Sequence, residues 1–512
     1  MKARASGHAA PRRARSSLGL GAGFLLFLGL LFCFHPGADG ARIGRMGAVA
    51  ALMAVWWITE ALPLAATSLL PFVLFPLLGI MTSKEIAPLY INSTIFLFLG
   101  GFLIALAMER WNLHRRIALK TLLWFGRSPA LLVLGFMGAC AFLSAWISNT
   151  ATAVAMLPVG MAVLHGLEER WGRDRTATLA VALMLGIAYA CSIGGVATLV
   201  GTPPNLALKT IFENTFPEAP KITFAQWSLL GVPLAVTMLI AAWLVLTKLW
   251  YPPDPGLRVD RRLLREQYAA LGPMAPEEKR VAGVFLTTAL LWMFRVKIEI
   301  GSVTIPGWSQ LFNRPGLIDD GTVAVTMALL LFLLPASGQP GERLLGGPVF
   351  ARVPWGIILL FGGGFALAEG FKVSGLSDWL GTTLFADVGG FPALGIVFLV
   401  CLAMTFLTEL TSNTASTQMV LPILAAIALA QSIHPLLLML PATLSASMAF
   451  MMPVATPPNA IVFGSHWLTV RQMARAGLVL NLIGVVLTTA TLYLVGVKVF
   501  DLGAAELPAW AR

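Results

Sequence analysis

The chain has 512 residues, of which 57% are hydrophobic and only 12% are charged, and its mean hydropathy is +0.82. A soluble chain of this length needs roughly twice that share of charged side chains to cover its surface. The composition therefore excludes an ordinary soluble protein and indicates a protein that crosses a membrane many times.

The excess of positive charge lies at the start of the chain and in one loop. The net charge is +11 at pH 7, with basic residues before the first apolar run and again between Arg258 and Arg280. The positive-inside rule places the N-terminus and this loop in the cytoplasm, with the chain in the cell membrane, plasma or inner. No basic groove with interleaved aromatic residues appears, so we expect contact with membrane lipid and no nucleic-acid partner.

Apolar runs long enough to cross the bilayer recur along the chain, and we expect about eleven spans. The first run, Leu18–Phe34, is longer than the apolar part of a signal peptide, and a poor cleavage site follows it. We therefore expect it to be a retained span. The four cysteines and six histidines show no disulfide or metal-ligand spacing, so a metal enzyme is not expected.

The sequence contains an internal duplication. Three pieces occur in the same order in each half: a glycine-rich span, a Ser-Asn-Thr tripeptide and a Thr-Pro-Pro-Asn tetrapeptide. They are Phe98–Phe102, Ser148–Thr150 and Thr202–Asn205 in the first half, and Phe361–Phe365, Ser412–Thr414 and Thr456–Asn459 in the second. With an odd number of spans in each half, this duplication predicts an inverted repeat, the architecture of many transporters. A parallel repeat is the alternative.

The duplication predicts the domain organisation. We expect a cytoplasmic tail and first span (1–40), a first repeat (41–250), a cytoplasmic linker with a short amphipathic helix near 261–270 (251–280), a second repeat (281–500) and a C-terminal tail (501–512). Each repeat should contain scaffold spans, a re-entrant hairpin and a broken span. The hairpins are expected at about 128–166 and 391–431, and the broken spans at about 177–212 and 436–463.

The polar motifs explain these expectations. Ser-Asn-Thr interrupts a stretch long enough for two half-spans, and non-helical backbone at membrane depth must be packed in protein or line a cavity. A helix that starts just after the tripeptide would point its N–H groups at the site. In Thr-Pro-Pro-Asn, two prolines remove two N–H donors, so the span must break there and release carbonyl oxygens.

These four breaks carry hydroxyl, amide and carbonyl groups, and no Arg, Lys, His or Cys. The set contains no nucleophile with a base, which argues against an enzyme. Hydroxyl and amide donors bind carboxylates, while the oxygen atoms suit an alkali cation such as Na⁺. The residue types therefore predict an ion-coupled anion carrier.

The paired Ser-Asn-Thr and Thr-Pro-Pro-Asn motifs, together with Ser445–Val462 and Trp56–Pro71, resemble the divalent anion:sodium symporter family of dicarboxylate and sulfate carriers. The resemblance covers about 45–500 and implies an all-α inverted repeat with two hairpins and two broken helices. It also implies a homodimer in which a transport domain moves against a scaffold domain like an elevator.

The resemblance further implies specific site residues. The first Na⁺ site would use Ser144, Ser148, Asn149 and the backbone of Gly201, and the second Thr408, Thr411, Asn413 and the backbone of Ala455. Substrate carboxylates would meet Asn149, Thr150, Asn413 and Thr414, with Thr202, Thr456 and Pro457 nearby. Two Na⁺ ions would balance a dianion, which avoids burying an unpaired charge.

Glu409 breaks the symmetry of the two halves, because its counterpart in the first half is Ala145. An acidic residue within a membrane span is a functional candidate by default. Glu409 is either a proton-coupling or cation-site residue, or a structural group that caps the hairpin turn, and we favour the structural role. Glu60, Glu109 and Glu369 lie near span ends, where a structural or interfacial role is expected.

We predict a carrier that imports C4-dicarboxylates such as succinate, fumarate or malate together with Na⁺. A Na⁺-independent dicarboxylate exchanger, or a carrier of sulfate, tartrate or citrate, is the alternative within transport. An anion channel is the alternative from a different class, and uphill accumulation would exclude it.

Overall fold

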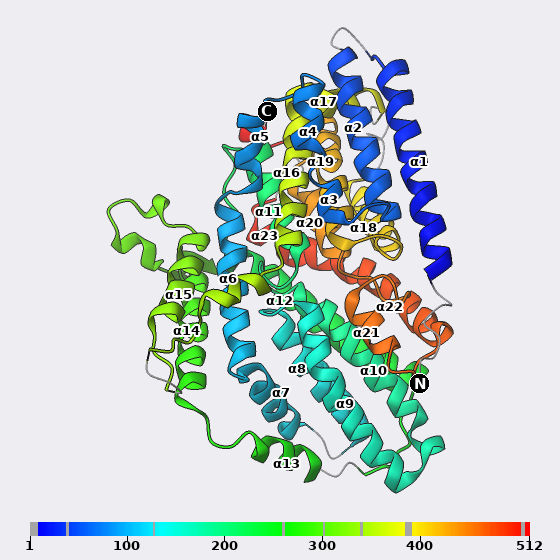
Figure 1. The fold of residues 1–512 in the computed structure, drawn as a ribbon, viewed down its shortest axis with the longest axis vertical. Coiled ribbons are helices and arrows are strands. Elements are labelled where there is room, and N and C mark those ends of the chain that lie inside the picture. The colour runs from blue at the N-terminus through cyan, green and yellow to red at the C-terminus, as the bar shows by residue number, and fades with distance from the viewer. Residues whose placement is uncertain are drawn as a thin grey trace.

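The computed structural model describes residues 9–36, 40–125, 128–258, 262–300, 303–337, 341–384, 392–502 and 507–511. The basic residues Lys2 and Arg4, which contribute to the expected orientation, lie outside this set, as does the expected start of the second hairpin at Phe391. The described chain is built mainly from helices, and its one sheet is a short antiparallel hairpin of two strands (Figure 1).

The first half of the chain contains twelve α-helices in the described residues. They are α1 (Ala9–Cys33), α2 (Gly40–Thr59), α3 (Leu64–Thr67), α4 (Leu70–Leu77), α5 (Ser83–Tyr90), α6 (Ser93–Arg110), α7 (Leu113–Trp124), α8 (Pro129–Ser144), α9 (Asn149–Trp171), α10 (Arg173–Gly195), α11 (Pro203–Thr215) and α12 (Phe224–Leu244), which continues as η1 (Val245–Trp250).

The second half follows a linker that contains α13 (Arg262–Ala270), the short helix expected near 261–270. Its elements are α14 (Pro276–Met293), β1 (Ile298–Ile300), β2 (Val303–Ile305), η2 (Trp308–Leu311), η3 (Pro315–Leu317), α15 (Asp320–Leu333), η4 (Gly347–Arg352), α16 (Trp355–Ser374), α17 (Leu376–Trp379), η5 (Leu380–Leu384), α18 (Ala393–Thr408), α19 (Asn413–Ala430), α20 (Leu436–Ser445), α21 (Pro457–Phe463), α22 (Val470–Thr491), η7 (Leu492–Gly496), α23 (Val497–Val499) and η8 (Ala509–Ala511).

Eight helices in the described residues are long and apolar enough to cross a membrane, and six further apolar helices are shorter. The shorter set includes α8, α18 and α20, which end at the Ser-Asn-Thr turns or at the break before the second Thr-Pro-Pro-Asn. These helices are short because the chain turns or unwinds at these motifs, and the eight long helices are fewer than the eleven spans expected from the sequence.

The two hairpins enter the molecule from opposite ends. Figure 1 shows α8 and α9 in the lower half and α18 and α19 in the upper half, with their tips toward the middle. Across the middle, α21 packs on α9 while α11 packs on α19, so each broken helix of one repeat supports the hairpin of the other. This exchange brings the two tripeptides and the two tetrapeptides into one region.

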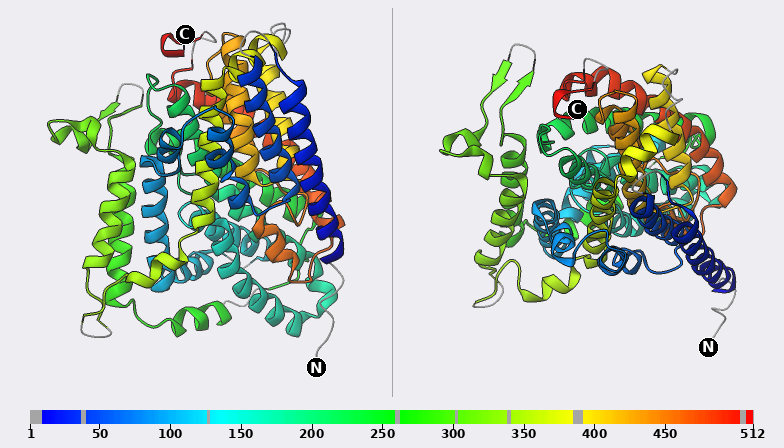
Figure 2. Two further views of the ribbon diagram at one scale, coloured as in Figure 1. Left: turned by 45° about the horizontal axis from the view of Figure 1, so that its top comes forward. Right: turned by 90° about the horizontal axis from the view of Figure 1, so that it is seen from above.

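Two apolar clusters form the core. The larger one runs through both repeats and includes the hairpins and broken helices. The smaller one joins α1, α2, α4 and α5 to α16, α17 and α19. The pair α14–α15 flanks the bundle and carries the β1–β2 hairpin at its end (Figure 2).

Candidate functional site

The first hairpin tip is a four-residue turn between α8 and α9. Ser144 ends α8, and its hydroxyl donates a 2.6 Å hydrogen bond to Oδ1 of Asn149. Ser148 caps the N-terminus of α9 by accepting a 3.2 Å hydrogen bond from the Ala151 N–H. The turn therefore places a hydroxyl and an amide oxygen side by side at the positive end of α9.

The second hairpin tip repeats this arrangement with a threonine. Oγ1 of Thr408 lies 2.5 Å from Oδ1 of Asn413 and 2.9 Å from the carbonyl oxygen of Ala446. In both halves the hydroxyl stands five positions before the asparagine. In the second half it also reaches the break between α20 and α21, so three oxygen atoms meet there.

Both broken helices are held open by the asparagine of the Thr-Pro-Pro-Asn motif. Nδ2 of Asn205 donates to the carbonyl oxygens of Gly195 and Thr198, at 3.1 and 2.7 Å. Nδ2 of Asn459 donates to those of Ala449 and Met452, at 3.2 and 3.1 Å. The carbonyls lie ten and seven positions before the asparagine in each case, so the two breaks have the same internal geometry.

Gly195 leaves room for the first group of oxygens. A Cβ atom placed on Gly195 would lie 2.7 Å from Oδ1 of Asn149 and 3.2 Å from the carbonyl oxygen of Gly201. The amide oxygen and the released carbonyl therefore face the same small space, which a side chain would fill. A hydroxyl, an amide oxygen and a carbonyl form the hard-oxygen set that an alkali cation prefers.

The other expected cation ligands lie in the same turns, with contacts of their own. The Thr411 hydroxyl donates to the carbonyl of Leu407 at 2.8 Å and is hydrogen-bonded to Ser416. Ala455 is buried, and its N–H donates to Met452 at 3.2 Å. A hydrogen bond therefore joins Thr408 directly to Asn413. Thr411 lies in the same turn as these residues and Ala455 lies in the neighbouring break, but both make their hydrogen bonds to other groups.

The expected substrate residues differ in exposure between the halves. Thr150 is exposed, whereas its counterpart Thr414 is buried. Asn149 and Asn413 are both half-buried, and Pro457 is exposed. The remaining two, Thr202 and Thr456, are buried at the N-termini of α11 and α21. The third residue of the tripeptide is thus exposed in the first hairpin and buried in the second.

Glu409 binds the break in the second broken helix. Its carboxylate accepts hydrogen bonds from the N–H groups of Phe450, Met451 and Met452, at 2.7, 2.8 and 3.0 Å. It also accepts a 2.7 Å bond from Nδ2 of Asn481, and only 3% of the residue is exposed. The three N–H groups have lost their helical acceptors, so the carboxylate replaces the missing carbonyls.

The first half has no carboxylate at this position, and neutral side chains there donate to backbone carbonyl oxygens. The Thr198 hydroxyl lies 2.5 Å from the carbonyl of Ala145, the counterpart of Glu409. Trp227 donates a 3.0 Å bond to the carbonyl of Val196. Thr198 and Trp227 carry no polar motif, so sequence reasoning missed them, whereas Gly195 was expected only to loosen the broken span. The one available signal was that glycine and threonine recur before the first Thr-Pro-Pro-Asn.

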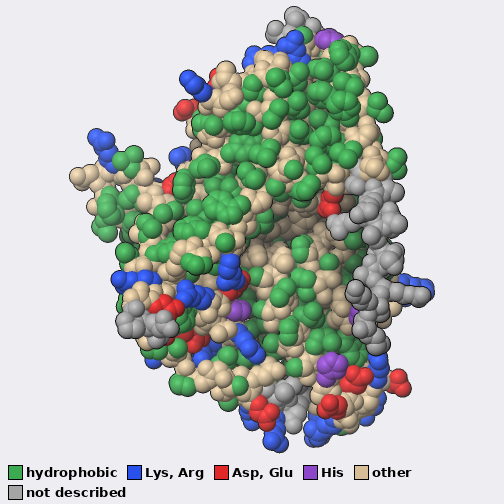
Figure 3. Space-filling view, in the orientation of Figure 1, with side chains coloured by type: hydrophobic (Ala, Val, Ile, Leu, Met, Phe, Trp, Pro, Cys, Tyr) green, Lys and Arg blue, Asp and Glu red, His purple; other side chains and the backbone are tan. Residues whose placement is uncertain are grey.

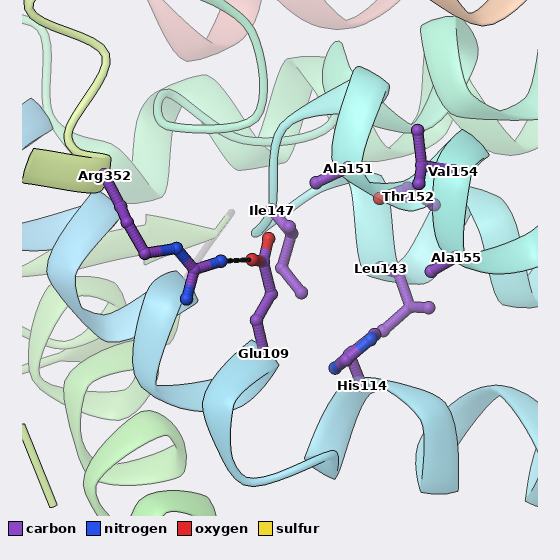
Figure 4. A pocket seen from close by; sticks show the side chains of 9 residues that line it. All are labelled: Glu109, His114, Leu143, Ile147, Ala151, Thr152, Val154, Ala155 and Arg352. Carbon is purple, nitrogen blue, oxygen red and sulfur yellow. Dashed lines mark hydrogen bonds and ion pairs between the residues drawn. The ribbon is translucent and has the colours of Figure 1, made fainter. Parts of the chain in front are cut away.

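A cleft leads to the first hairpin tip from the side of α13. It has a volume of about 420 Å³, and its lining includes Glu109 of α6, His114 of α7 and Arg352 of η4, together with Ile147 and Thr152 of the first hairpin (Figure 4). Figure 3 shows that this face of the molecule is hollowed near its middle. Leu410 at the second tip and Val454 in the second break are 74% and 79% exposed, so these segments lie at the surface of the molecule.

Comparison with known proteins agrees with this geometry. The family described as "Sodium:sulfate symporter transmembrane region" matches residues 19–499. The chain is 41% identical over 485 residues to the sodium-dependent dicarboxylate transporter SdcS of Staphylococcus saprophyticus, covering 93% of this chain and 90% of that protein. It is 41% identical over 494 residues to SdcS of Staphylococcus aureus, covering 95% and 92%.

Solved structures of membrane transporters share the fold. The chain matches YdaH of Alcanivorax borkumensis with a TM-score of 0.55 at 13% identity, over 98% of this chain and 99% of that one. It matches MtrF of Neisseria gonorrhoeae with a TM-score of 0.52 at 13% identity, over 88% and 94%. At this identity the similarity concerns the fold alone.

Proposed function

The chain belongs to the sodium:sulfate symporter family, and we propose that it imports C4-dicarboxylates such as succinate, fumarate or malate together with Na⁺. It is a membrane transporter and not an enzyme. The relatives that match almost its full length are named sodium-dependent dicarboxylate transporters, which supports Na⁺ as the coupling ion and a small dianion as the substrate.

The observation that carries the proposal is the repeated hydroxyl–asparagine pair beside a broken helix. Ser144 with Asn149, and Thr408 with Asn413, each bring two oxygens within hydrogen-bond distance. When a cation binds, each hydroxyl can turn its hydrogen away and offer a lone pair. Each half-site would then hold one Na⁺, with Ser148 and the Gly201 carbonyl completing the first.

The substrate would lie between the two tips. Helices α9 and α19 begin at Asn149 and Asn413. The free N–H groups at each helix N-terminus favour one of the two carboxylates of the substrate. We assign the carboxylates to Asn149, Thr150, Asn413 and Thr414, with Thr202, Thr456 and Pro457 around them. Two Na⁺ ions would offset the two negative charges, which explains why transport needs Na⁺.

An elevator motion is what the family resemblance implies. We assign α1–α7 and α14–α17 to a scaffold, of which α1, α2, α4, α5, α16 and α17 meet in the smaller apolar cluster. The hairpins, broken helices, α12 and α22 would form the mobile transport domain. We propose a homodimer in the cell membrane, with the scaffolds in contact and with the N-terminus and α13 in the cytoplasm.

Uptake into proteoliposomes tests this function. The purified chain should accumulate labelled succinate against its gradient when Na⁺ is outside, and K⁺ or choline should not replace Na⁺. Equal accumulation in K⁺ would refute Na⁺ coupling. Exchange of internal for external succinate without Na⁺ would favour the exchanger, and downhill flux alone would favour a channel.

The site assignment needs a separate test. Asn149→Ala and Asn413→Ala should each abolish uptake while the protein stays folded, as judged by its elution and melting temperature. Unchanged uptake in both variants would overturn the assignment and leave the family membership intact.

A further inference from the structure

The cleft separates two helices whose counterparts in the other repeat are packed together. In the second half, α16 of the proposed scaffold packs along α19 of the proposed transport domain. The related helices of the first half are α6 and α9, and these two, both described over their full length, have hardly any contact. Instead, Glu109 of α6 and Val154 of α9 line the cleft (Figure 4). The structure therefore shows one such contact closed and the related one open.

The repeated glycine-rich spans show this difference at single residues. Gly364 of α16 and Gly101 of α6 occupy the same place in the repeat. A Cβ atom placed on Gly364 would overlap the side chain of Gln418, which belongs to α19. A Cβ atom placed on Gly101 would meet only Val200, at 3.6 Å, and no side chain of α9. Gly364 thus receives a side chain from the opposing helix, whereas Gly101 does not.

Gln418 and Val154 stand at the same place in the two hairpins, one turn of helix beyond the threonine of Ser-Asn-Thr. Gln418 is fully buried, whereas Val154 is 56% exposed. Neither Oε1 nor Nε2 of Gln418 has a hydrogen-bond partner in the described part of the chain. An amide that is always buried normally has partners, so this one fits a contact that opens to water in another state of the protein.

We propose that the contact of Gln418 with Gly364, which we call the seal, closes the path between the scaffold and the transport domain on the side away from α13, and that it separates in each transport cycle. The proposal rests on the elevator motion proposed above. Because Gly364 has no side chain, the Gln418 amide reaches the backbone of α16 and fills the contact. When the two helices part, the amide gains water as its hydrogen-bond partner.

The related pair predicts how the opposite state is closed. In the first repeat, Val154 would meet Gly101 once the cleft on the α13 side closes. The two contacts differ in polarity, because burial of a valine is favourable, whereas burial of Gln418 leaves its amide unpaired. The seal that is closed in this structure is therefore the less favourable of the two, which promotes its reopening.

Cysteine labelling of the purified full-length chain, without Na⁺ or substrate, tests the seal. Cys33→Ser removes the exposed native thiol, and the other three cysteines are buried. Val154→Cys then reports whether the cleft is open to a charged maleimide. Gly364→Ala should slow this labelling about tenfold, because overpacking the seal disfavours the state in which it is closed. Gly101→Ala makes the same change at the related glycine and should not slow the labelling, so it is the matched control.

Variants of Gln418 separate the seal from ordinary packing. Gln418→Ala, added to Gly364→Ala, should restore the labelling rate, because the shorter side chain leaves room for the new methyl group. Gln418→Glu should slow labelling as Gly364→Ala does, because a carboxylate without a partner is costly to bury. Gln418→Met, which has a similar length and no polar group, should leave the labelling rate unchanged.

Unchanged labelling would overturn the proposal. If the contact is only structural, Gly364→Ala and Gln418→Glu lower the melting temperature while Val154→Cys reacts as before. Equal slowing by Gly101→Ala would also overturn the seal. Should Gly364→Ala not fold, Gln418→Glu compared with Gln418→Met gives the same test. A chain that takes up succinate with Na⁺ but shows no change in labelling keeps the proposed function and loses the seal, whereas absence of Na⁺-driven uptake in the native chain would overturn the function.

Discussion

Replacement of Glu409 by alanine should selectively weaken the second Na⁺ site. The carboxylate binds three consecutive N–H groups in the break between α20 and α21. Without it, the Phe450 N–H keeps Oδ1 of Asn481 at 3.3 Å, while those of Met451 and Met452 have no other partner in the described part of the chain.

The size of the effect follows from these two N–H groups. An unsatisfied buried donor costs about 1–3 kcal/mol, and the lower part of this range applies because Met451 and Met452 are only half-buried. The ordered form of the break should therefore lose about 2–3 kcal/mol in total. This corresponds to a shift of roughly 30- to 150-fold toward forms in which the carbonyls of the break do not face Thr408 and Asn413.

The assay is the Na⁺ dependence of succinate uptake in proteoliposomes. Glu409→Ala should need at least about tenfold more Na⁺ for half-maximal uptake, and saturating Na⁺ should restore most of the rate. Glu409→Gln should be milder, because it keeps one acceptor oxygen. Glu169→Gln, an exposed acid near the end of α9, is the control. An unchanged Na⁺ requirement in Glu409→Ala would refute the positioning role, and loss of pH dependence alone would instead assign a proton to this carboxyl.

Three further substitutions test other parts of the structure. Gly195→Ala should lower Na⁺ affinity at least about tenfold, because the new methyl group crowds the space between the Asn149 amide oxygen and the Gly201 carbonyl oxygen. Gly138→Ala on α8, where a methyl group would meet no atom within 4 Å, should leave Na⁺ affinity unchanged in the same uptake assay. Arg116→Met should destabilise the fold by about 2 kcal/mol in thermal melting, because it leaves the largely buried carboxylate of Glu278 without its partner; an unaltered melting temperature would contradict this. Asn459→Leu should abolish uptake, because the two carbonyls of the second break lose their donor; normal uptake would show that the break does not need it.

The sequence predicts the general arrangement of the site because polar motifs are rare in this apolar chain and therefore easy to recognise. The two tripeptides and the two tetrapeptides are polar interruptions in an apolar chain, and each one coincides with a hairpin turn or a helix break in the structure. Their duplication predicts that the site has two related halves. The ends of the helices follow from local chemistry, since Ser148 caps α9 and Thr456 caps α21.

The partners of these groups could not be predicted, because they depend on packing between distant segments. Glu409 binds a break that begins some forty positions later, and Asn481 lies on α22 with no motif to mark it. Gly195 and Thr198 are small residues whose importance appears only when the Asn149 side chain approaches the break. The pairing of Arg352 with Glu109 likewise joins elements from different repeats.

The two half-sites differ in charge, because only the second has a carboxylate beside its break. This difference should make the Na⁺ affinity of the second site higher than that of the first. Each break must satisfy backbone groups at membrane depth. In the first half the neutral Thr198 and Trp227 donate to backbone carbonyls, whereas in the second half the carboxylate of Glu409, the residue after Thr408, accepts from backbone N–H groups. A negative charge beside a cation site strengthens cation binding. In the native background the weaker first site sets the Na⁺ concentration for half-maximal uptake, so Ser144→Ala should raise this concentration more than Thr408→Ala does. In a Glu409→Gln background the two substitutions should raise it by similar amounts. Equal effects of the two substitutions in the native background would show that the carboxylate orders the break without adding to the affinity of the second site.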